Sequence, residues 1–571
     1  MKTFLIFIGA VFFAALSWAQ PSIPPALKKA LAHPEKITEL DLNDQNLTTL
    51  PESIGRLTNL RKLNLSFNRL TSLPQNFGQL KNLKVLNLMS NHLTNLPQHF
   101  GQLKNLEKLE IGFNDLKSFP LTLTTLTNLQ TLDVSYNPMK ALPESIGALK
   151  KLKVLKSSSW MLATIPQSLA LLQKLEVLDL YGCKLPAFPT QVLQLHNLTK
   201  LHLSFAKPTK VPTGIQKLQK LTHLLVSNSS HQVLPEAITQ LSRLVSLSWI
   251  NGRLTRLPKR IGRLNKLQVL DLAFNKIETL PNSIGRLQAL TKLNMLWNQL
   301  GVFPEVVTKL KKLQDLNLTK NGLKVFPEGI TQLKNLKVLD LASNEIKTLP
   351  PGVAQLRQLT ELDLGGNKLT AFPRVVVRLE KLTSLNLEKA ALKRLPHSIT
   401  QLKHLQTLCL AECQLAIFPE YIDQLEKLTQ LDLSGNELTQ IPPNILRLKK
   451  LKSLKLGNND IGKFPEVIVR LKNLKVLDLS FNAITMVPTK IARLNKLVRL
   501  DLSSNFLAAL PKRLGRLKKI HILLLNHNQL VRLPSSIAKM RNLIRLDLQQ
   551  NPLKEQEKAR LRALFPRAVK F

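Results

Sequence analysis

The stretch KVLDLASNEIKTLP, from Lys337 to Pro350, contains the unit from which almost the whole chain is built. The full unit reads L-x-x-L-x-L-x-x-N-x-L-x-x-L-P-x-x-I-x-x-L-x-x and recurs every 23 residues, first at Ile37 and last at Leu543. The chain therefore contains 23 consecutive repeats with no insertion or deletion between them. We number the positions of each repeat from 1 to 23, so that Asn344 stands at position 9.

Each half of the repeat predicts a different local structure. In the L-x-L half, alternate side chains point to opposite sides of an extended chain, so the leucines turn inward. The proline at position 15, for example Pro51, cannot donate a hydrogen bond to a sheet and ends the strand. The next residues place Ile54 and Leu57 three apart, which suits a short helical turn.

Stacking is required because one repeat cannot bury its own apolar side, whereas successive repeats share one core. At roughly 4.8 Å per strand, the stack predicts a parallel sheet on the order of 100 Å long. The predicted fold class is therefore α/β, a curved solenoid with its parallel sheet on the concave face and short helices or turns on the convex face.

These motifs resemble the leucine-rich repeat family, and the L-P-x-x-I-x-x-L half is similar to its Ras-group type, which many bacterial proteins share. The resemblance implies a binding scaffold. We expect four segments: a signal peptide over residues 1–19, an N-terminal cap over 20–36, the solenoid over 37–550 and a C-terminal cap over 551–571. The caps would cover the open ends of the core with a helix in PALKKALAHPEK and with Leu561, Leu564 and Phe565.

The first residues, MKTFLIFIGAVFFAALSWAQ, have the charged, apolar and small-residue order of a secretory signal cleaved after Ala19. An uncleaved anchor is the alternative. No later apolar run is long enough to span a bilayer. We therefore expect export to the periplasm, the cell surface or the medium. With only three cysteines, the exported chain must depend on its apolar core for stability and not on disulfides.

Position 9 is Asn in 15 repeats, for example Asn68, Asn137 and Asn275, and would turn inward to satisfy buried backbone groups of the bend. Repeats six to ten lack it and carry Trp160, Cys183, Ala206, Ser229 and Gly252 instead. We expect Trp160 to lie in the interior and to alter the local curvature without touching a ligand. Whether these irregular repeats form a joint or a binding site stays open.

The formal net charge of +44 is unevenly placed. Strand positions 2, 3, 5, 7 and 8 hold 16 Lys or Arg and 19 Asp or Glu, so the predicted concave face is nearly neutral. Positions 20, 22 and 23 of the first 22 repeats hold 33 Lys or Arg and two acids, Glu380 and Glu426. The basic back could attract a polyanion such as lipopolysaccharide or an acidic glycan, or it could only keep the protein soluble. Nucleic acid is disfavoured because few aromatic residues accompany the basic ones.

A candidate partner-binding patch combines apolar, aromatic and histidine residues at strand positions expected to face outward between repeats seven and twelve. Such clusters mark interface centres, although aromatic residues at position 8 also serve as rim packing. The patch comprises Tyr181, Phe205, Leu225, Ile250, Phe274, Leu296 and Trp297, with His202 and His223 beside them.

No sequence motif indicates catalysis. Cys409 and Cys413 should point to opposite sides of their strand, and no His or Cys group with metal spacing lies near them. No phosphate-binding Gly loop, H-E-x-x-H or G-x-S-x-G motif occurs. We therefore expect an exported, non-enzymatic protein without cofactor or metal that recognises a protein or peptide through its concave surface. The alternative is a polyanion binder that uses the convex back.

Overall fold

The computed structural model describes residues 24–566 and 568–571, so the predicted signal peptide lies outside the described residues. The chain divides into two compact units, one ending at Val226 and the other beginning at Ser227. We call them the N-terminal unit and the C-terminal unit and describe each by itself. No helix among the described residues combines the length and apolar character needed to cross a bilayer.

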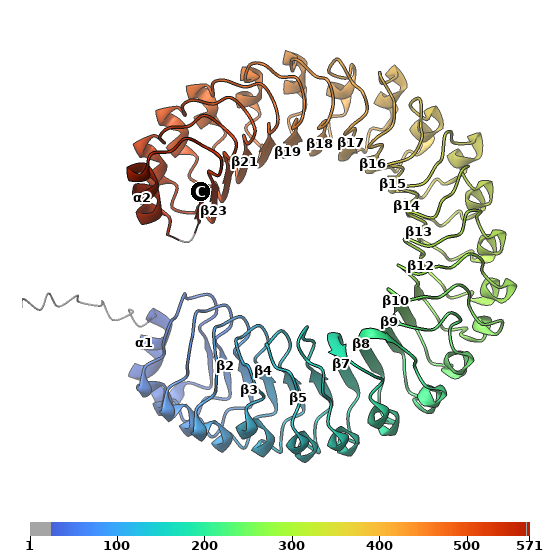
Figure 1. Cartoon of the computed structure of the whole chain (residues 1–571). Helices are drawn as coiled ribbons and strands as arrows, with labels where there is room; N and C mark the ends of the chain where they lie inside the picture. Colours follow the sequence, from blue (N-terminus) through green and yellow to red (C-terminus); the bar gives the residue numbers. More distant parts are fainter. Residues whose placement is uncertain (1–23, 567) are drawn as a thin grey trace, which may run out of the picture. The chain divides into compact units, whose positions relative to one another are not determined.

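In the N-terminal unit, the strands run along one side and short 3-10 helices along the other (Figure 1). Each strand pairs in parallel with the next, from β1 to β8. The strands are β1 (Glu39–Asp41), β2 (Lys62–Asn64), β3 (Val85–Asn87), β4 (Lys108–Glu110), β5 (Thr131–Asp133), β6 (Val154–Lys156), β7 (Val177–Leu185) and β8 (Lys200–Thr209). Strand β9 (His223–Ser229) contains the boundary between the units.

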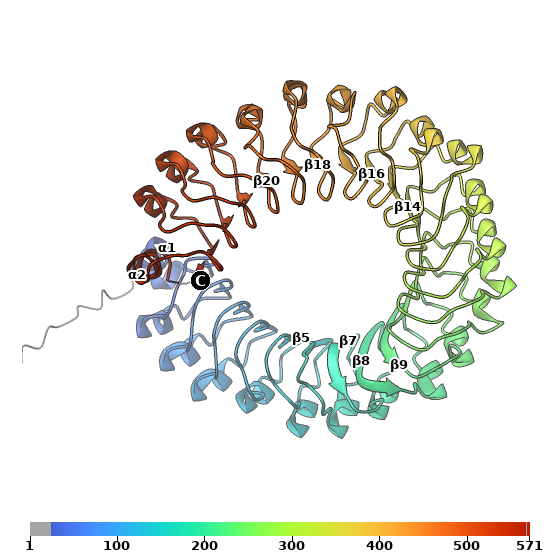
Figure 2. The same cartoon turned by 45° about the horizontal axis from the view of Figure 1, so that its top comes forward.

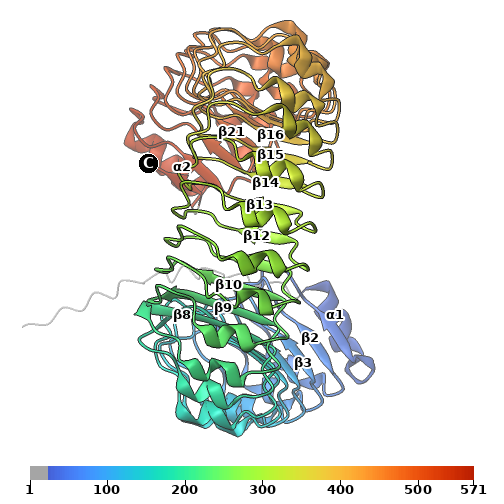
Figure 3. The same ribbon diagram turned by 90° about the vertical axis from the view of Figure 1, so that its right-hand side faces the viewer.

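In the C-terminal unit, the strands follow one another in chain order on the inner side and the 3-10 helices lie on the outer side (Figures 2 and 3). The strands are β10 (Ser246–Ile250), β11 (Val269–Asp271), β12 (Lys292–Asn294), β13 (Asp315–Asn317), β14 (Val338–Asp340), β15 (Glu361–Asp363), β16 (Ser384–Asn386), β17 (Thr407–Cys409), β18 (Gln430–Asp432), β19 (Ser453–Lys455), β20 (Val476–Asp478), β21 (Arg499–Asp501), β22 (Ile522–Leu524), β23 (Arg545–Asp547) and β24 (Val569–Lys570).

The strand register confirms the repeat. The typical strand occupies positions 3 to 5, and its central leucine pairs with the leucine 23 residues later, as Leu339 does with Leu362. These leucines are buried, while the flanking side chains face away from the core. Because side chains alternate along a strand, a slip of one residue would bring the polar set inward, so the buried leucines fix the register.

The prolines at position 15 precede 3-10 helices on the helix side of each unit. Each of these helices buries the apolar residue at position 18, such as Ile54 in η2. The N-terminal unit contains η1 (Pro34–Lys36), η2 (Glu52–Arg56), η3 (Gln75–Gln79), η4 (Gln98–Gln102), η5 (Leu121–Thr125), η6 (Glu144–Ala148), η7 (Gln167–Leu171), η8 (Thr190–Gln194) and η9 (Thr213–Lys217). The C-terminal unit contains η10 (Glu236–Gln240), η11 (Ile261–Arg263), η12 (Asn282–Arg286), η13 (Glu305–Lys309), η14 (Glu328–Gln332), η15 (Pro351–Gln355), η16 (Arg374–Arg378), η17 (His397–Gln401), η18 (Ile422–Gln424), η19 (Pro443–Arg447), η20 (Glu466–Arg470), η21 (Thr489–Arg493), η22 (Lys512–Arg516) and η23 (Ser535–Lys539).

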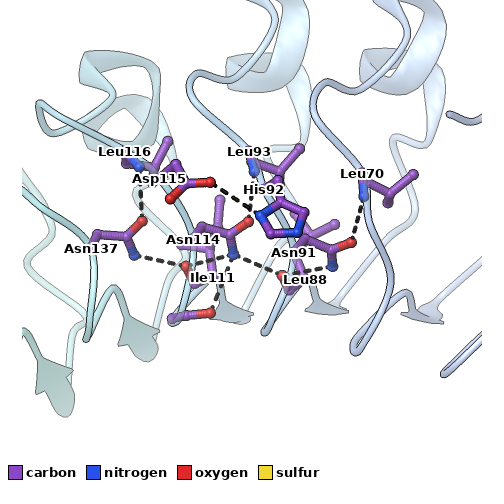
Figure 4. Close-up of polar contacts among 11 residues, drawn as sticks. Leu70, Leu88, Asn91, His92, Leu93, Ile111, Asn114, Asp115, Leu116 and Asn137 are labelled. Carbon is purple, nitrogen blue, oxygen red and sulfur yellow. Dashed lines mark hydrogen bonds and ion pairs between the residues drawn. The ribbon is translucent and has the colours of Figure 1, made fainter. Parts of the chain in front are cut away.

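The asparagines at position 9 form a buried ladder of side-chain hydrogen bonds (Figure 4). The Asn114 amide nitrogen donates to the carbonyl oxygens of Leu88 at 2.9 Å and of Ile111 at 3.2 Å. Its amide oxygen accepts from the Leu93 backbone N–H at 2.9 Å. Asn91 and Asn137 repeat this pattern one repeat away on either side. Each side chain thus satisfies backbone groups of two successive bends, as the sequence predicts.

The expected interior placement of Trp160 is wrong. Its side chain is 62% exposed, and Ser159 is buried in its place. The Ser159 hydroxyl donates to the Asn137 carbonyl oxygen at 2.7 Å, so a buried donor is kept here although its acceptor differs from those of the asparagines. Serine is short enough to reach this carbonyl from position 8, so the bulky indole stays outside.

Two other substitutions at position 9 keep a hydrogen-bond donor in the core. The thiol of Cys183 donates to the Ser157 carbonyl oxygen at 3.3 Å, and the thiol of Cys413 donates to the Leu387 carbonyl oxygen at 3.1 Å. In each case the acceptor lies 26 residues earlier, as it does for the asparagines. Cysteine therefore replaces one of the bonds that asparagine makes.

A helix lies at each end of the described repeats. Helix α1 (Pro25–Ala32) buries Leu27 and Ala30 and contacts β1 and η2. Helix α2 (Glu555–Leu564) buries Leu561, and Phe565 behind it is also buried. Leu564, expected in the same lid, is 39% exposed. Strand β24 adds to β23 as a last parallel strand.

Candidate functional site

The strand side of the N-terminal unit carries a shallow recess of about 380 Å³. Its lining residues come from positions 5, 7 and 8 of repeats four to nine. They are Phe113, Asp133, Ser135, Tyr136, Lys156, Ser158, Asp179, Tyr181, His202 and Leu225. We call this set the strand-side recess. Three of the residues predicted for a binding patch, Tyr181, His202 and Leu225, belong to it.

An aromatic pair borders the recess. The rings of Phe113 and Tyr136 stack with centroids 4.3 Å apart and planes 18° from parallel. Both residues are exposed and have a backbone φ of 55°, the left-handed region that non-glycine residues rarely adopt. Tyr181 is exposed at position 7 two repeats after Tyr136. Stacked, rigid and accessible rings offer contact area at a low cost in conformational entropy.

A row of charged residues that ends in a histidine crosses the recess at position 5. Asp133 pairs in register with Lys156, Lys156 with Asp179, and Asp179 with His202. The Lys156 ammonium lies 3.7 Å from the Asp133 carboxylate, and the His202 Nδ1 lies 3.3 Å from the Asp179 carboxylate. Opposite charges on facing positions of adjacent strands attract each other, so the row fixes the orientation of these side chains.

Asp179 is the most strongly held carboxylate of this row. Its Oδ1 accepts hydrogen bonds from the Ser158 hydroxyl and from the Tyr181 backbone N–H, both at 3.0 Å. Burial by itself would raise the pKa of Asp179, but the hydrogen bond from His202 and these two donors outweigh it and leave the pKa below its usual value. Asp179 is therefore an anion at neutral pH. Two repeats after Asp179, burial and the nearby charges of Lys200 and His202 lower the pKa of His223.

The C-terminal unit carries a separate strand-side cluster at position 8 of successive repeats. The rings of Phe274 and Trp297 lie 5.6 Å apart, and the Lys320 ammonium lies 3.3 Å from the centre of the Trp297 ring. This is a cation–π contact, in which the electron-rich ring face attracts the ammonium. Leu296 and Ile250 on the same side are half-buried. Of the predicted patch residues, Tyr181, His202 and Leu225 thus lie in the strand-side recess, and Phe274 and Trp297 lie in this second cluster.

The expected outward placement of Phe205 is wrong, because this side chain is only 3% exposed. Strands β7 and β8 are longer than the others, and their register shifts after Leu180 so that Leu185 faces Phe205. Phe113 and Tyr136 have left-handed backbones at position 8, whereas Phe205 has no positive φ there. The strand continues through position 8 and directs the ring into the core.

Sequence reasoning did not assign Phe113, Tyr136, Asp133, Lys156 or Lys320 to a site. The signal that could have found them is the period itself, since residues 23 apart lie side by side in the sheet. A comparison of positions 5, 7 and 8 between adjacent repeats brings Asp133, Lys156 and Asp179 together from the sequence alone.

The cysteines show no sign of an active thiol. All three are free, and Cys183 and Cys413 are buried. Burial raises the pKa of Cys409 to about 11 and the pKa of Cys413 to about 12. Within residues 24–566 and 568–571, no three His, Cys, Asp or Glu side chains come together in a way that could hold a metal ion.

Comparison with known proteins identifies the class of this fold. Models described as leucine rich repeat match residues 311–369, 357–415, 426–484 and 449–507, and a model of a leucine-rich repeat region matches 36–119 and 245–324. The chain belongs to the leucine-rich repeat family. A search of curated proteins gave no match.

Several solved structures are similar to this chain. A leucine-rich repeat protein of Leptospira interrogans is 30% identical, with 95% of this chain and 98% of that chain covered and a TM-score of 0.45. The structure of PEPR1 with AtPEP1 is 26% identical, covers 90% of this chain and 81% of that chain, and has a TM-score of 0.50. A TDR receptor is 25% identical, with 90% of this chain and 93% of that chain covered and a TM-score of 0.56.

Proposed function

We propose that this protein is an exported, non-enzymatic binding protein that recognises a protein or peptide through its strand-side surface. The observation that supports this proposal best is the strand-side recess, where the exposed Phe113–Tyr136 stack adjoins the ordered charges of Asp133, Lys156 and Asp179. Aromatic anchors beside fixed charges are what a polypeptide ligand needs, because the rings supply affinity and the charges supply orientation. The similarity to the structure of PEPR1 with AtPEP1 is consistent with this use of the fold.

The recess suits an extended peptide with both apolar and charged side chains. A ligand ammonium could approach Asp133 or Asp179, and a ligand carboxylate could approach Lys156. A volume of about 380 Å³ holds a few side chains and not a whole domain, so the partner would present a loop, a tail or a free peptide.

A random peptide library displayed on phage and selected on the immobilised full chain tests the proposal. We expect enriched peptides whose binding weakens at least tenfold when Phe113 and Tyr136 are both changed to Ala. The matched control is Phe481→Ala, because Phe481 occupies the same repeat position with a similar backbone and is exposed outside both clusters. No enrichment, or equal effects of the two sets of changes, would contradict the proposal.

Export is part of the proposal and has its own test. If the signal is cleaved after Ala19, N-terminal sequencing of the protein recovered from outside the cytoplasm will begin at Gln20. Recovery of the protein only in the cytoplasm with Met1 in place would contradict export.

A second candidate function is polyanion binding at the helix side, with lipopolysaccharide or an acidic glycan as the ligand. It is supported by the 33 Lys or Arg and two acids at positions 20, 22 and 23 of the first 22 repeats. Such binding weakens steeply as salt is added, because bound counterions are released from a polyanion. Binding to an acidic glycan that does not change between low and physiological salt would exclude it.

A further inference from the structure

Two adjoining recesses interrupt the helix side of the C-terminal unit, and they have volumes of about 1010 and 870 Å³. Both are formed by positions 19 to 23 of three successive repeats, the larger over η17, η18 and η19 and the smaller over η15, η16 and η17. Lys403 and His404 line both recesses. These recesses bring basic side chains of neighbouring repeats around shared hollows.

The larger recess contains a buried carboxylate. Asp423 at position 19 is 5% exposed, and its Oδ2 accepts a hydrogen bond from Arg447 Nη1 at 3.0 Å. In the sequence, no other repeat carries a charged residue at position 19, where Gly, Ala and Thr predominate. A buried carboxylate of this kind holds the guanidinium in one orientation. The Arg447 side chain remains largely accessible, so its other N–H groups can meet a ligand.

The remaining cations of the two recesses lack carboxylate partners within the described residues. Lys381 donates to the side-chain oxygen of Gln358 at 2.7 Å, and the Lys427 ammonium lies 3.0 Å from Nδ1 of His404. These contacts orient the two ammonium groups without a direct carboxylate partner. These cations are Arg357, Arg378, Lys381, Lys403, Lys427, Lys449 and Lys450.

Acidic residues limit what can bind here. Glu380 and Glu426, the two acids among positions 20, 22 and 23 of the first 22 repeats, each line one of the recesses. A long polyanion with continuous charge would have to pass these carboxylates and would be repelled by them. A compact ligand with separated anionic groups can contact the cations and avoid the glutamates.

We propose that the recess around the Asp423–Arg447 pair binds a compact ligand that carries two or more phosphate or sulfate groups. The inference rests on the second candidate function, attraction of anions to the helix side, and assigns it one location and one ligand class. Arg447 supplies oriented N–H donors for an oxyanion, and Lys403, Lys449 and Lys450 supply the surrounding positive charge.

The chain contains its own control for this site. The sequence Arg-Leu-Lys-Lys occurs at 447–450 and again at 516–519, at the same repeat positions and with all four lysines exposed. Only the first copy faces a buried aspartate in the preceding repeat, because the corresponding residue before the second copy is Ala492. The double variants K449Q/K450Q and K518Q/K519Q therefore remove the same charge from matched places.

Isothermal titration of the full chain with myo-inositol hexakisphosphate tests the proposal, and sucrose octasulfate as a second probe distinguishes phosphate from sulfate preference. We expect binding of one or both compact probes, at least tenfold weaker in K449Q/K450Q and changed less than twofold in K518Q/K519Q. Circular dichroism should show both variants folded, since the lysines are exposed.

Three results would overturn the assigned site. Equal weakening in the two variants would mean that diffuse charge on the helix side attracts anions, so the second candidate function would stand without this location. Binding of dextran sulfate with no binding of either compact probe would refute the ligand class. Absence of binding to all three probes would refute both the site and the second candidate function, and would leave peptide binding at the strand-side recess unaffected.

Discussion

Each asparagine at position 9 makes several buried hydrogen bonds, so its contribution to the free energy of unfolding can be measured with a single substitution. The Asn459 amide nitrogen donates to the carbonyl oxygens of Leu433 at 3.0 Å and Leu456 at 3.1 Å, and its oxygen accepts from the Leu438 N–H at 3.0 Å. Truncation leaves these buried backbone groups unsatisfied, so Asn459→Ala should lower the free energy of unfolding by about 1–3 kcal/mol. Urea unfolding followed by circular dichroism measures this change.

The neighbouring Asn458 provides the control for that experiment. Asn458 is exposed at position 8 with a φ of 54°, a conformation that glycine adopts without strain. Asn458→Gly should change the free energy of unfolding by less than about 0.5 kcal/mol. If both variants lose the same stability, the buried ladder is not the source of the effect.

Burial should make the thiols slow to react. The thiolate is the reactive form, and a pKa near 11 for Cys409 against an ordinary 9.0 lowers its thiolate fraction at pH 8 about a hundredfold. Iodoacetamide labelling of the native protein should therefore be slow and should accelerate as the pH rises toward 11. Labelling in urea, where the thiols regain their ordinary pKa, is the control. Fast labelling of the native chain at pH 8 would contradict this account.

Asp179 should contribute to the change in folding stability at acidic pH. Its pKa is lowered in the folded state, so its ionised form favours folding at pH values above the unfolded value of 3.8. This contribution is lost as the pH falls below 3.8 through the folded pKa. Asp179→Asn should therefore be less stable than the wild type at pH 6, and the difference should shrink as the pH falls below 3.8. A difference that does not change with pH would show that the carboxylate charge plays no part.

Among the secondary structure elements, the short strands and 3-10 helices could be predicted from the sequence with little loss. The period of 23 fixes where each strand and each proline falls, and the register between Leu339 and Leu362 follows from it. Elements of this kind are set by local pattern and nearest-neighbour packing, which are both visible in the sequence.

The long strands β7 and β8 could not be predicted in this way. In the regular repeats the residue at position 8 is left-handed and the side chain at position 9 points inward, but Ser159 in repeat six and Phe205 in repeat eight have no positive φ at position 8. Phe205 is buried because the backbone stays extended there, and Trp160 is exposed because Ser159 takes the inward place. Both placements were predicted wrongly because the backbone of the regular repeats was assumed for repeats six and eight, whose backbone differs at position 8. The predicted patch includes the buried Phe205 for the same reason, and as a binding site the patch stays a prediction.

The C-terminal helix α2 should stabilise the end of the C-terminal unit by covering its core. The Leu561 side chain of this helix is fully buried, whereas the Leu564 side chain of the same helix is 39% exposed. Leu561→Ala should cost about 2–4 kcal/mol through lost burial and the cavity left behind, and Leu564→Ala less than about 1 kcal/mol. Hydrogen exchange of β23 and β24 should increase in the first variant before that of strands farther along the C-terminal unit. Equal effects of the two substitutions would show that α2 does not cover the core.

The net positive charge affects the stability of the whole folded chain. The 81 Lys or Arg and 37 Asp or Glu leave a formal charge of +44, and many of the cations stand at repeating positions 20, 22 and 23. Like charges repel more strongly in the folded chain, where they are held close together, than in the expanded unfolded chain. The surface ion pairs of the described residues, such as Lys62 with Glu39 at 2.7 Å, contribute little in water.

The net repulsion predicts that salt stabilises this protein. Raising NaCl from about 20 to about 200 mM shortens the screening length from roughly 20 to roughly 7 Å, which weakens repulsion between neighbouring repeats. The thermal unfolding midpoint should therefore rise by several degrees over this range, and KCl at equal ionic strength should act alike if screening is the cause. A midpoint that falls with salt would show that attractive ion pairs outweigh the repulsion, and the excess of basic residues would then not be a cost to folding.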